Sequence, residues 1–505
     1  MRKAKILATL GPATDNEAVI ASMLTAGLNA IRINMSHGDH ADHERRIAAA
    51  RAAAEKLGLP LAVLADLSGP KIRTRTLAGG MSVELSEGSR FVLTNREVEG
   101  NSNEVSTNFD ALPSAVSAGA RILLDDGAIE LRVESTTETD VVCTVVVGGT
   151  LAERKGINLP NTKLPIPSMT PKDHIDLEWA MAQNVDYIAL SFVRSAEDCN
   201  EAKAKIKELN TRKIGRPLLI AKIEKAEAID NLEDIVQAAD GLMVARGDLG
   251  VETSVELVPV YQKHIIELSV ARDKPVITAT QMLQSMIENP FPTRAEASDV
   301  ANAVWDGTDA VMLSAETAAG KHPIEAVRTM ARIIDSAETI RAPHLKKPVK
   351  FSLPPSGRTS QALCKAAAYA AREMHTEKIA VFTESGLMAR RLSTIRSGLQ
   401  TFALTTSLDV RNQLSLIWGV LPFYDKDLDP SGNEIPQDGR SVTDLLGHLD
   451  ADKTADLLRN GERILLRAGV VSSGETIIIM AGRLSGCGLS SSVIVWTIGE
   501  KVARR

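Results

Sequence analysis

Eight short apolar runs recur along the first two thirds of the chain, and most are followed by a stretch rich in Ala, Glu and Lys. The runs occupy residues 5–11, 29–36, 61–68, 186–193, 217–224, 241–248, 275–282 and 309–316. The intervening stretches, such as EDCNEAKAKIKELN, have the spacing of helices. Repeated strand-then-helix units predict parallel strands, and eight of them favour a closed (β/α)₈ TIM barrel. A doubly wound open sheet is the alternative.

Two segments depart from this repeat. Residues 71–165, between the third and fourth runs, are rich in Val, Thr and Glu, with turn signals at Gly79-Gly80 and Asp125-Asp126-Gly127. Alternation of apolar and polar positions around such turns predicts a small inserted β-barrel that caps the larger one. After a polar, proline-rich linker, new strand candidates predict a C-terminal α/β domain over residues 342–505. The catalytic barrel would then comprise residues 1–70 and 166–341.

Composition narrows the class of protein. The 505 residues exceed one ordinary core, and 44% hydrophobic with 24% charged residues is usual for a globular protein. A net charge of -6 and 3% aromatic residues argue against nucleic-acid binding. The four cysteines are far apart, no secretory signal is recognisable, and no apolar run approaches the roughly 18 residues of a membrane span. We therefore expect a cytoplasmic protein without a nucleic-acid or membrane partner.

Polar residues gather near the ends of the apolar runs, where a buried strand would otherwise stay apolar. They are Arg32, Asn34, Ser36, Asp66, Lys222, Glu224, Arg246, Asp248, Thr280 and Glu316. The carboxyl ends of barrel strands form the active sites of barrel enzymes. The spacing therefore predicts that these side chains converge on one mouth.

The types of residue suggest the chemistry of this mouth. Glu224 and Asp248 offer two carboxylates from consecutive runs for a divalent cation, while Arg32 and Lys222 offer positive charge for a phosphoryl group. The backbone after Gly247 opens a helix that could face an anion. Each signal has a plainer interpretation, such as a structural Lys222–Glu224 ion pair or a helix cap at Asp248. Together they predict a metal-assisted site for a phosphorylated or carboxylated small molecule.

Eleven short motifs resemble those of the pyruvate kinase family, in order and over nearly the whole chain. They are ATLGPAT (8–14), IRINMSHG (31–38), DLSGPKIR (66–73), DDG (125–127), KGINLP (155–160), SFVR (191–194), AKIE (221–224), MVARGDLGVE (243–252), TATQMLQSM (278–286), PTRAEASDVANAV (292–304) and SAETAAGKHP (314–323). The resemblance implies transfer of the phosphoryl group of phosphoenolpyruvate to ADP, the final step of glycolysis. It further implies Mg²⁺ or Mn²⁺ as cofactor and a homotetramer.

The resemblance also implies roles for residues of the mouth. Glu224 and Asp248 would hold the metal, and Arg32 and Lys222 the transferring phosphoryl group. The substrate carboxylate would rest on Gly247, Asp248 and Thr280, and Thr280 would help to deliver a proton to the enolate, through water.

Nucleotide contacts are implied for Arg73, His37 and Lys155, although His37 could equally be a solvated loop residue. The inserted domain, hinged near Pro70 and Pro165, would close over the mouth and exclude water.

One position departs from the pattern of many relatives. Those that need K⁺ carry Glu where this chain has Lys71. The cation-site positions Asn34, Ser36 and Asp66 match, so we expect the Lys71 ammonium to replace K⁺ and K⁺ not to be required. The alternative is a surface Lys71 beside an ordinary cation site.

The C-terminal domain contains a candidate effector site. Thr383, Ser385 and Gly386 lie between a predicted strand and a helix, a junction suited to phosphate, and the resemblance places a phosphorylated allosteric effector there, helped by the loop 482–492. A plain turn is the alternative. The polar segment 425–442 departs from the usual connection, as a mobile loop or an insertion.

Several other assignments stay open. Arg294 and Glu296 suggest a structural or subunit-interface pair, and Ser314 and Glu316 could brace the mouth. A metal-dependent barrel aldolase or lyase could share the Glu/Asp pair without needing ADP. A non-catalytic effector-binding or scaffold relative is the other alternative.

Overall fold

The computed structural model describes residues 2–160, 162, 166–211, 216–340, 355–424, 451–482 and 490–499. The segment 425–442, residues 483–489 of the terminal loop, most of the linker after residue 341 and the expected hinge at Pro165 lie outside them. Within the described part, no helix is both long and apolar enough to cross a membrane.

Eight parallel strands form a closed barrel in the order β1-β16-β15-β14-β13-β12-β3-β2. They are β1 (Lys5–Thr9), β2 (Ala30–Asn34), β3 (Ala62–Asp66), β12 (Tyr187–Leu190), β13 (Leu218–Ile223), β14 (Gly241–Ala245), β15 (Val276–Ala279) and β16 (Ala310–Leu313). Each strand lies within one of the eight predicted runs. The predicted barrel is confirmed, and the open sheet is wrong.

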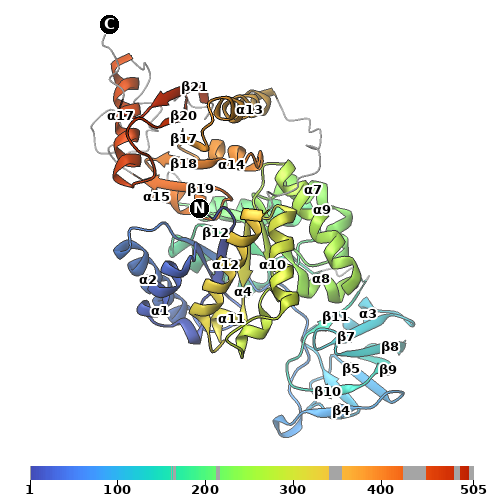
Figure 1. The fold of residues 1–505 in the computed structure, drawn as a ribbon. Coiled ribbons are helices and arrows are strands. Elements are labelled where there is room, and N and C mark those ends of the chain that lie inside the picture. The colour runs from blue at the N-terminus through green and yellow to red at the C-terminus, as the bar shows by residue number, and fades with distance from the viewer. Residues whose placement is uncertain are drawn as a thin grey trace.

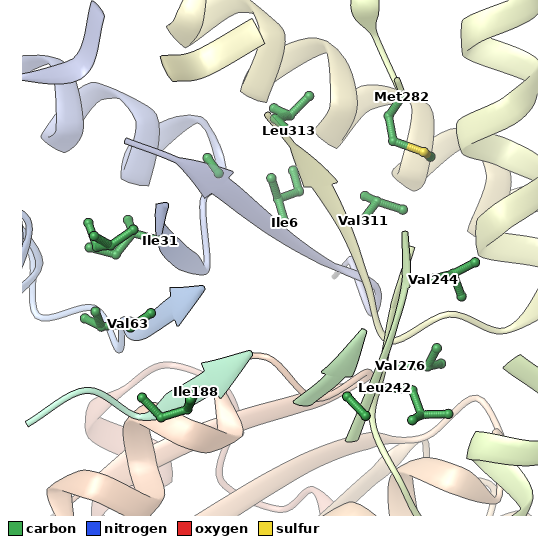
Figure 2. Packing of buried hydrophobic residues seen from close by; sticks show 14 of the residues in the cluster. Ile6, Ile31, Val63, Ile188, Leu242, Val244, Val276, Met282, Val311 and Leu313 are labelled. Carbon is green, nitrogen blue, oxygen red and sulfur yellow. The ribbon is translucent and has the colours of Figure 1, made fainter. Parts of the chain in front are cut away.

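Helices surround this barrel and bury its outer face. They are α1 (Glu17–Ala26), α2 (His40–Lys56), α4 (Pro171–Ala182), α5 (Ala196–Leu209), α6 (Ala226–Asp230), α7 (Leu232–Ala238), α8 (Arg246–Glu252), α9 (Val258–Ala271), α10 (Arg294–Asp306), α11 (Ala315–Ala318) and α12 (Pro323–Ile340). Outward strand residues such as Ile6, Ile31 and Val311 pack in the layer between strands and helices (Figure 2). Alternate residues such as Leu7 and Leu64 fill the interior, because side chains in a strand alternate between faces.

The segment between β3 and β12 forms a curled six-stranded sheet with a two-stranded sheet beside it. The larger sheet runs in the order β11 (Ile157–Asn158), β7 (Arg121–Leu124), β8 (Ile129–Thr136), β9 (Asp140–Val147), β5 (Arg90–Thr94) and β6 (Glu104–Ser106). The smaller sheet pairs β10 (Gly149–Leu151) with β4 (Val83–Leu85), and α3 (Leu112–Ala115) completes the insertion. Burial alternates along β8 and β9, as predicted. The insertion lies next to α8 (Figure 1).

The C-terminal part is an α/β unit, as predicted. Its sheet has the order β19 (Val420–Tyr424), β18 (Gln400–Thr405), β17 (Lys378–Phe382), β20 (Thr476–Gly482) and β21 (Ser490–Thr497), with β21 antiparallel. Its helices are α13 (Pro355–Glu373), α14 (Leu387–Thr394), α15 (Leu408–Leu414) and α17 (Ala451–Arg467). This unit lies on the opposite side of the barrel from the inserted sheets (Figure 1).

The C-terminal unit closes the amino end of the barrel. Leu416, fully buried, belongs to the same apolar cluster as the barrel interior. Tyr187 Oη donates to the carbonyl of Gln413 at 2.6 Å, and Arg396 pairs with Asp309 at 3.1 Å. The C-terminal unit therefore leaves the carboxyl end of the barrel open (Figure 1).

Lys5 is a buried cation at this closed end. Its Nζ donates to the Val420 carbonyl at 2.7 Å, and 4% of the residue is exposed. Burial, and then the charge of Arg2, lower the pKa of Lys5 to about 7, against the opposing charges of Glu338 and Asp309. The unfolded chain, with a lysine pKa of about 10.4, binds more protons above pH 7, so this residue makes stability rise between pH 7 and 10.

We expect Lys5→Met to increase the free energy of unfolding by about 1–3 kcal/mol near pH 6 and by little near pH 10. Thermal melts of both proteins across this pH range provide the measurement. Lys56→Met, at a largely exposed position, serves as the control and should leave the melting profile unchanged. The prediction would be contradicted if the increase in stability caused by Lys5→Met did not become smaller as the pH rises.

Candidate active site

A cluster of buried ionic side chains occupies the carboxyl end of the barrel. Arg32 on β2 places Nε 2.7 Å from Asp66 Oδ2 at the end of β3. Lys222 on β13 places Nζ 3.2 Å from Asp66 Oδ1 and 3.1 Å from Glu224 Oε1. Lys222 and Glu224 are two residues apart and share a face. The structure thus brings together four of the predicted residues, with Asp66 as the shared partner of the two cations.

Burial and charge shape the protonation of this cluster. Burial alone would raise the pKa of Asp66, but Lys222 and Arg32 outweigh it and lower that pKa. Burial would lower the pKa of Lys222, but Asp66 and Glu224 outweigh it and raise that pKa. Burial raises the pKa of Glu224, and Lys222 offsets only part of this effect. Lys222 therefore stays charged, while its charge compensates only part of the burial of Glu224.

The segment after β12 supports both Lys222 and Glu224. Lys222 Nζ donates to Ser191 Oγ at 2.7 Å, and the backbone N–H of Phe192 donates to Glu224 Oε2 at 2.6 Å. Phe192 has a φ of 55°, an uncommon conformation for a residue with a large side chain. Sequence reasoning assigned no role to Ser191 or Phe192, although the motif SFVR contains both.

Thr9 was missed in the same way. Arg32 Nη1 donates to Thr9 Oγ1 at 3.1 Å, and Thr9 Oγ1 in turn donates to the Leu313 carbonyl at 3.0 Å. The motif ATLGPAT contains Thr9, so its place at the end of a predicted strand was the available signal.

Helix α8 and the loop after β15 form the next part of the mouth. α8 begins at Arg246, directly after β14, so Gly247 and Asp248 lie in its first turn. The N–H of Gly247 donates to Thr280 Oγ1 at 3.0 Å. Thr280 and Gln281 have positive φ angles of 62° and 54°. The predicted Gly247, Asp248 and Thr280 are therefore neighbours.

Of the three residues predicted to bind nucleotide, Arg73 and Lys155 belong to the insertion, and His37 follows β2 of the barrel. Lys155 Nζ pairs with Asp125 Oδ1 at 2.9 Å, and Arg73 Nη1 donates to the Arg154 carbonyl at 3.1 Å. His37 is exposed. Partial burial, followed by the charges of Arg73, Arg32 and Lys71, lowers the pKa of His37. His37 thus lies in the same positive field as Arg73.

Lys71 links the insertion to the barrel. Its Nζ lies 3.4 Å from Asp248 Oδ1 and 3.9 Å from Asp126 Oδ1, in the turn before β8. Asp66, in the predicted cation region, is paired with Arg32 and Lys222 instead. The other two members of that region also lie at the mouth, where Ser36 N–H donates to Asn34 Oδ1 at 3.2 Å.

Two further glutamates support the loops of the mouth. Glu316 accepts hydrogen bonds from Ser314 N at 2.7 Å and Leu283 N at 3.2 Å. Glu296 accepts a hydrogen bond from Ser285 N at 2.6 Å, and its side chain also accepts from the backbone of Thr293, the N-cap residue of α10. Arg294 is exposed. The partners that the structure gives Glu296 are thus Ser285 and Thr293, whereas the expectation was a pair with Arg294.

The candidate effector loop connects β17 to α14. Thr383 follows β17 and is 9% exposed, whereas Ser385 is exposed. Gly386 has a φ of 72° and Arg390 Nη1 donates to the Ser385 carbonyl at 3.2 Å. One carboxylate oxygen of Glu384 is buried without a hydrogen-bond partner, and burial raises the pKa of this group. The loop lies on the far side of the barrel from the mouth.

A TIM barrel with paired carboxylates, a charged lysine and an arginine at its mouth defines an enzyme that handles an anionic substrate. The family model "Pyruvate kinase, barrel domain" matches residues 1–327, and "Pyruvate kinase, alpha/beta domain" matches residues 361–495. The chain therefore belongs to the pyruvate kinase family and is a phosphotransferase.

Individual relatives agree with this assignment. Pyruvate kinases of Staphylococcus saprophyticus and Bacillus licheniformis are each 40% identical over 100% of this chain and 82% of their own length. A solved pyruvate kinase from Cryptosporidium parvum has a TM-score of 0.85 and 33% identity, covering 98% of this chain and 96% of that one.

Proposed function

We propose that this enzyme transfers the phosphoryl group of phosphoenolpyruvate to ADP, giving pyruvate and ATP in the final step of glycolysis. The cluster in which Asp66 joins Arg32 to Lys222, with Glu224 beside it, carries the proposal. Two fixed cations at one mouth suit a phosphoryl group that passes between two oxygens, because this transfer depends on positioning and electrostatic stabilisation.

Lys222 and Arg32 would bind the transferring group. Their positions are fixed by Asp66, so little reorganisation is needed when negative charge develops on the phosphoryl oxygens. The raised pKa of Lys222 keeps its ammonium charged at neutral pH.

Glu224 and Asp248 would hold Mg²⁺ or Mn²⁺. They follow the neighbouring strands β13 and β14. Burial, and also the negative charge of Asp248, raise the pKa of Glu224 although Lys222 opposes them, so an added cation would fit these two carboxylates. The described residues contain no group of three or more His, Cys, Asp or Glu ligands, so the remaining ligands would be substrate and water oxygens. The metal would supply neutralisation of phosphoryl charge.

The substrate carboxylate would lie against the first turn of α8. Gly247, Asp248 and Thr280 surround this place, and Thr280 would help to return a proton to the enolate through water. The contact between Gly247 N and Thr280 Oγ1 supports the proposal, since it places the hydroxyl at the helix start.

ADP would lie between the barrel and the insertion, in contact with Arg73, His37 and Lys155. The insertion would close over the mouth by movement near Pro70, and the exclusion of water would limit hydrolysis of the phosphoryl donor. The ion pairs of Lys71 with Asp126 and Asp248 connect the two parts in the observed arrangement.

Pyruvate formation from phosphoenolpyruvate, ADP and Mg²⁺ in a potassium-free buffer tests the function and its K⁺ independence together. We expect full activity, no product without ADP, and little change when K⁺ is added. Activity only with K⁺ would retain the reaction and contradict the role of Lys71. Turnover of phosphoenolpyruvate without ADP would favour the lyase alternative.

We also propose an allosteric site for a phosphorylated effector at Thr383, Ser385 and Gly386. The strand–loop–helix junction and the exposed Ser385 support it. Thr383→Val with Ser385→Ala is expected to abolish the response of the phosphoenolpyruvate saturation curve to AMP and sugar phosphates, without lowering kcat. An unchanged effector response would contradict the site.

The cytoplasmic homotetramer is a further proposal. Exposed apolar side chains on the barrel surface, Val255, Val260 and Phe291, support a subunit contact. Light scattering should give about four times the chain mass of 54.2 kDa.

A further inference from the structure

The loop after β15 holds a strained conformation at a site of proposed chemistry. Thr280 has a φ of 62° and Gln281 follows with a φ of 54°. Positive φ is a steric outlier for a β-branched residue. Such a conformation persists only where the surrounding structure enforces it.

The guanidinium of Arg246 donates hydrogen bonds to the backbone carbonyls of the two peptide groups that flank the strained Thr280. Its Nε donates to the Ala279 carbonyl at 3.1 Å, and its Nη2 donates to the Thr280 carbonyl at 2.6 Å. Nη1 is anchored to Asp299 Oδ1 on α10 at 2.7 Å, and only 11% of the arginine side chain is exposed. The planar fork of arginine fits two successive carbonyls, whereas an ammonium carries no such fixed geometry.

The residue after Arg246 orients the threonine side chain. Gly247 N–H donates to Thr280 Oγ1 at 3.0 Å, and this hydrogen bond occupies one lone pair of the hydroxyl oxygen. The hydroxyl proton then remains available for a substrate or water oxygen. One dipeptide, Arg246-Gly247, thus sets both the backbone and the side chain of Thr280.

We propose that Arg246 is a positioning residue, which holds Thr280 so that its hydroxyl serves proton transfer at the enolate carbon. This inference rests on the proposed function, and on the role of Thr280 in particular. Arg246 itself contacts neither substrate nor metal in this scheme. Its loss would let the loop relax toward negative φ and move the hydroxyl out of position.

The test separates proton transfer from phosphoryl transfer. In D₂O, the intact Mg²⁺-loaded enzyme with pyruvate and ATP should exchange the methyl protons of pyruvate: a C–H bond breaks to give the enolate, and a solvent deuteron forms the new C–D bond. NMR follows this exchange. Arg246→Met is expected to slow it about 10- to 100-fold, with a similar fall in kcat and a KM for ADP changed less than about twofold.

A double-mutant cycle identifies the route of the effect. If Arg246 acts through Thr280, Arg246→Met should add little to the loss caused by Thr280→Val. Arg246→Lys should behave like Arg246→Met, because it keeps the charge and loses the fork. The matched control is Arg332→Met. Arg332 is an exposed arginine that pairs with Glu325 on the outer helix α12, and this variant should exchange the methyl protons of pyruvate at the normal rate.

Four results would overturn the inference. Additive losses in the cycle, or normal exchange by Arg246→Lys, would show that the fork does not act through Thr280. Normal exchange by Arg246→Met, with a slow Thr280→Val, would reject the inference and keep the role of Thr280. Normal exchange by Thr280→Val would reject both.

A variant that keeps the guanidinium covers the case in which Arg246→Met does not fold. Asp299→Asn removes the negative charge that pairs with Arg246. Like Arg246→Met, it is expected to slow the exchange of pyruvate methyl protons, here a few-fold, with little change in melting temperature. Normal exchange by this folded variant would then overturn the inference.

Discussion

Replacement of Lys222 by Met is expected to lower kcat for pyruvate formation by on the order of 10³-fold. The Nζ of Lys222 lies within 3.2 Å of Asp66, Glu224 and Ser191, so its position is fixed before substrate binds. The substitution removes a preorganised charge from the path of the phosphoryl group. It also leaves Glu224 buried without its cationic partner, which is costly in a site of low exposure.

Steady-state kinetics with varied phosphoenolpyruvate provide the measurement, with thermal melts to establish that the variant is folded. Lys222→Arg, which keeps the charge in a different geometry, should recover only part of the loss. Lys205→Met on the outer helix α5, where the lysine pairs with an exposed Glu208, is the matched control. A folded Lys222→Met enzyme with kcat within tenfold of the parent would contradict the proposed role.

Replacement of Lys71 by Glu is expected to make the enzyme depend on K⁺. In potassium-free buffer the variant should lose about 10- to 100-fold in activity, and K⁺ should restore most of it. In the parent, Lys71 is the cation paired with Asp248 and Asp126. The Lys71→Glu substitution places a second carboxylate beside that of Asp248 and removes one positive charge from the mouth.

Titration of both proteins with KCl, at constant ionic strength maintained by tetramethylammonium chloride, measures this dependence. Lys71→Met is the informative comparison, since it removes the ammonium without adding a carboxylate, and it should show an intermediate requirement. Equal and large stimulation of parent and Lys71→Glu by K⁺ would contradict the proposal that the ammonium replaces K⁺.

The architecture was predictable from the sequence because it depends on local periodicity. Each barrel strand lies within a run that was recognisable as apolar, and the alternating burial of β8 and β9 appears in the sequence as period two. The same runs placed Lys222 and Glu224 together near the end of a predicted strand. Eight strands of this kind close into a barrel, and closure brings all strand ends to one mouth.

Specific partners were not predictable, because they depend on register between strands that are distant in sequence. Nothing local shows that Asp66 joins Arg32 to Lys222, or that Lys71 reaches Asp248 and Asp126 rather than Asp66. These contacts follow from strand pairing across the closed barrel and from the position of the insertion.

The roles of the supporting residues also depend on the tertiary structure. Ser191 and Phe192 ended a predicted strand without any sign that they hold Lys222 and Glu224. Arg246 was recognisable as a polar residue at a strand end, but its hydrogen bond to the Thr280 carbonyl depends on the backbone geometry of that strained loop. The sequence alone thus determined the barrel, its insertion and the residues of the mouth, because hydrophobic period and residue type are local properties. Tertiary structure alone decided which of those residues are paired, strained or held, because distances between side chains on different strands exist only after the barrel has closed.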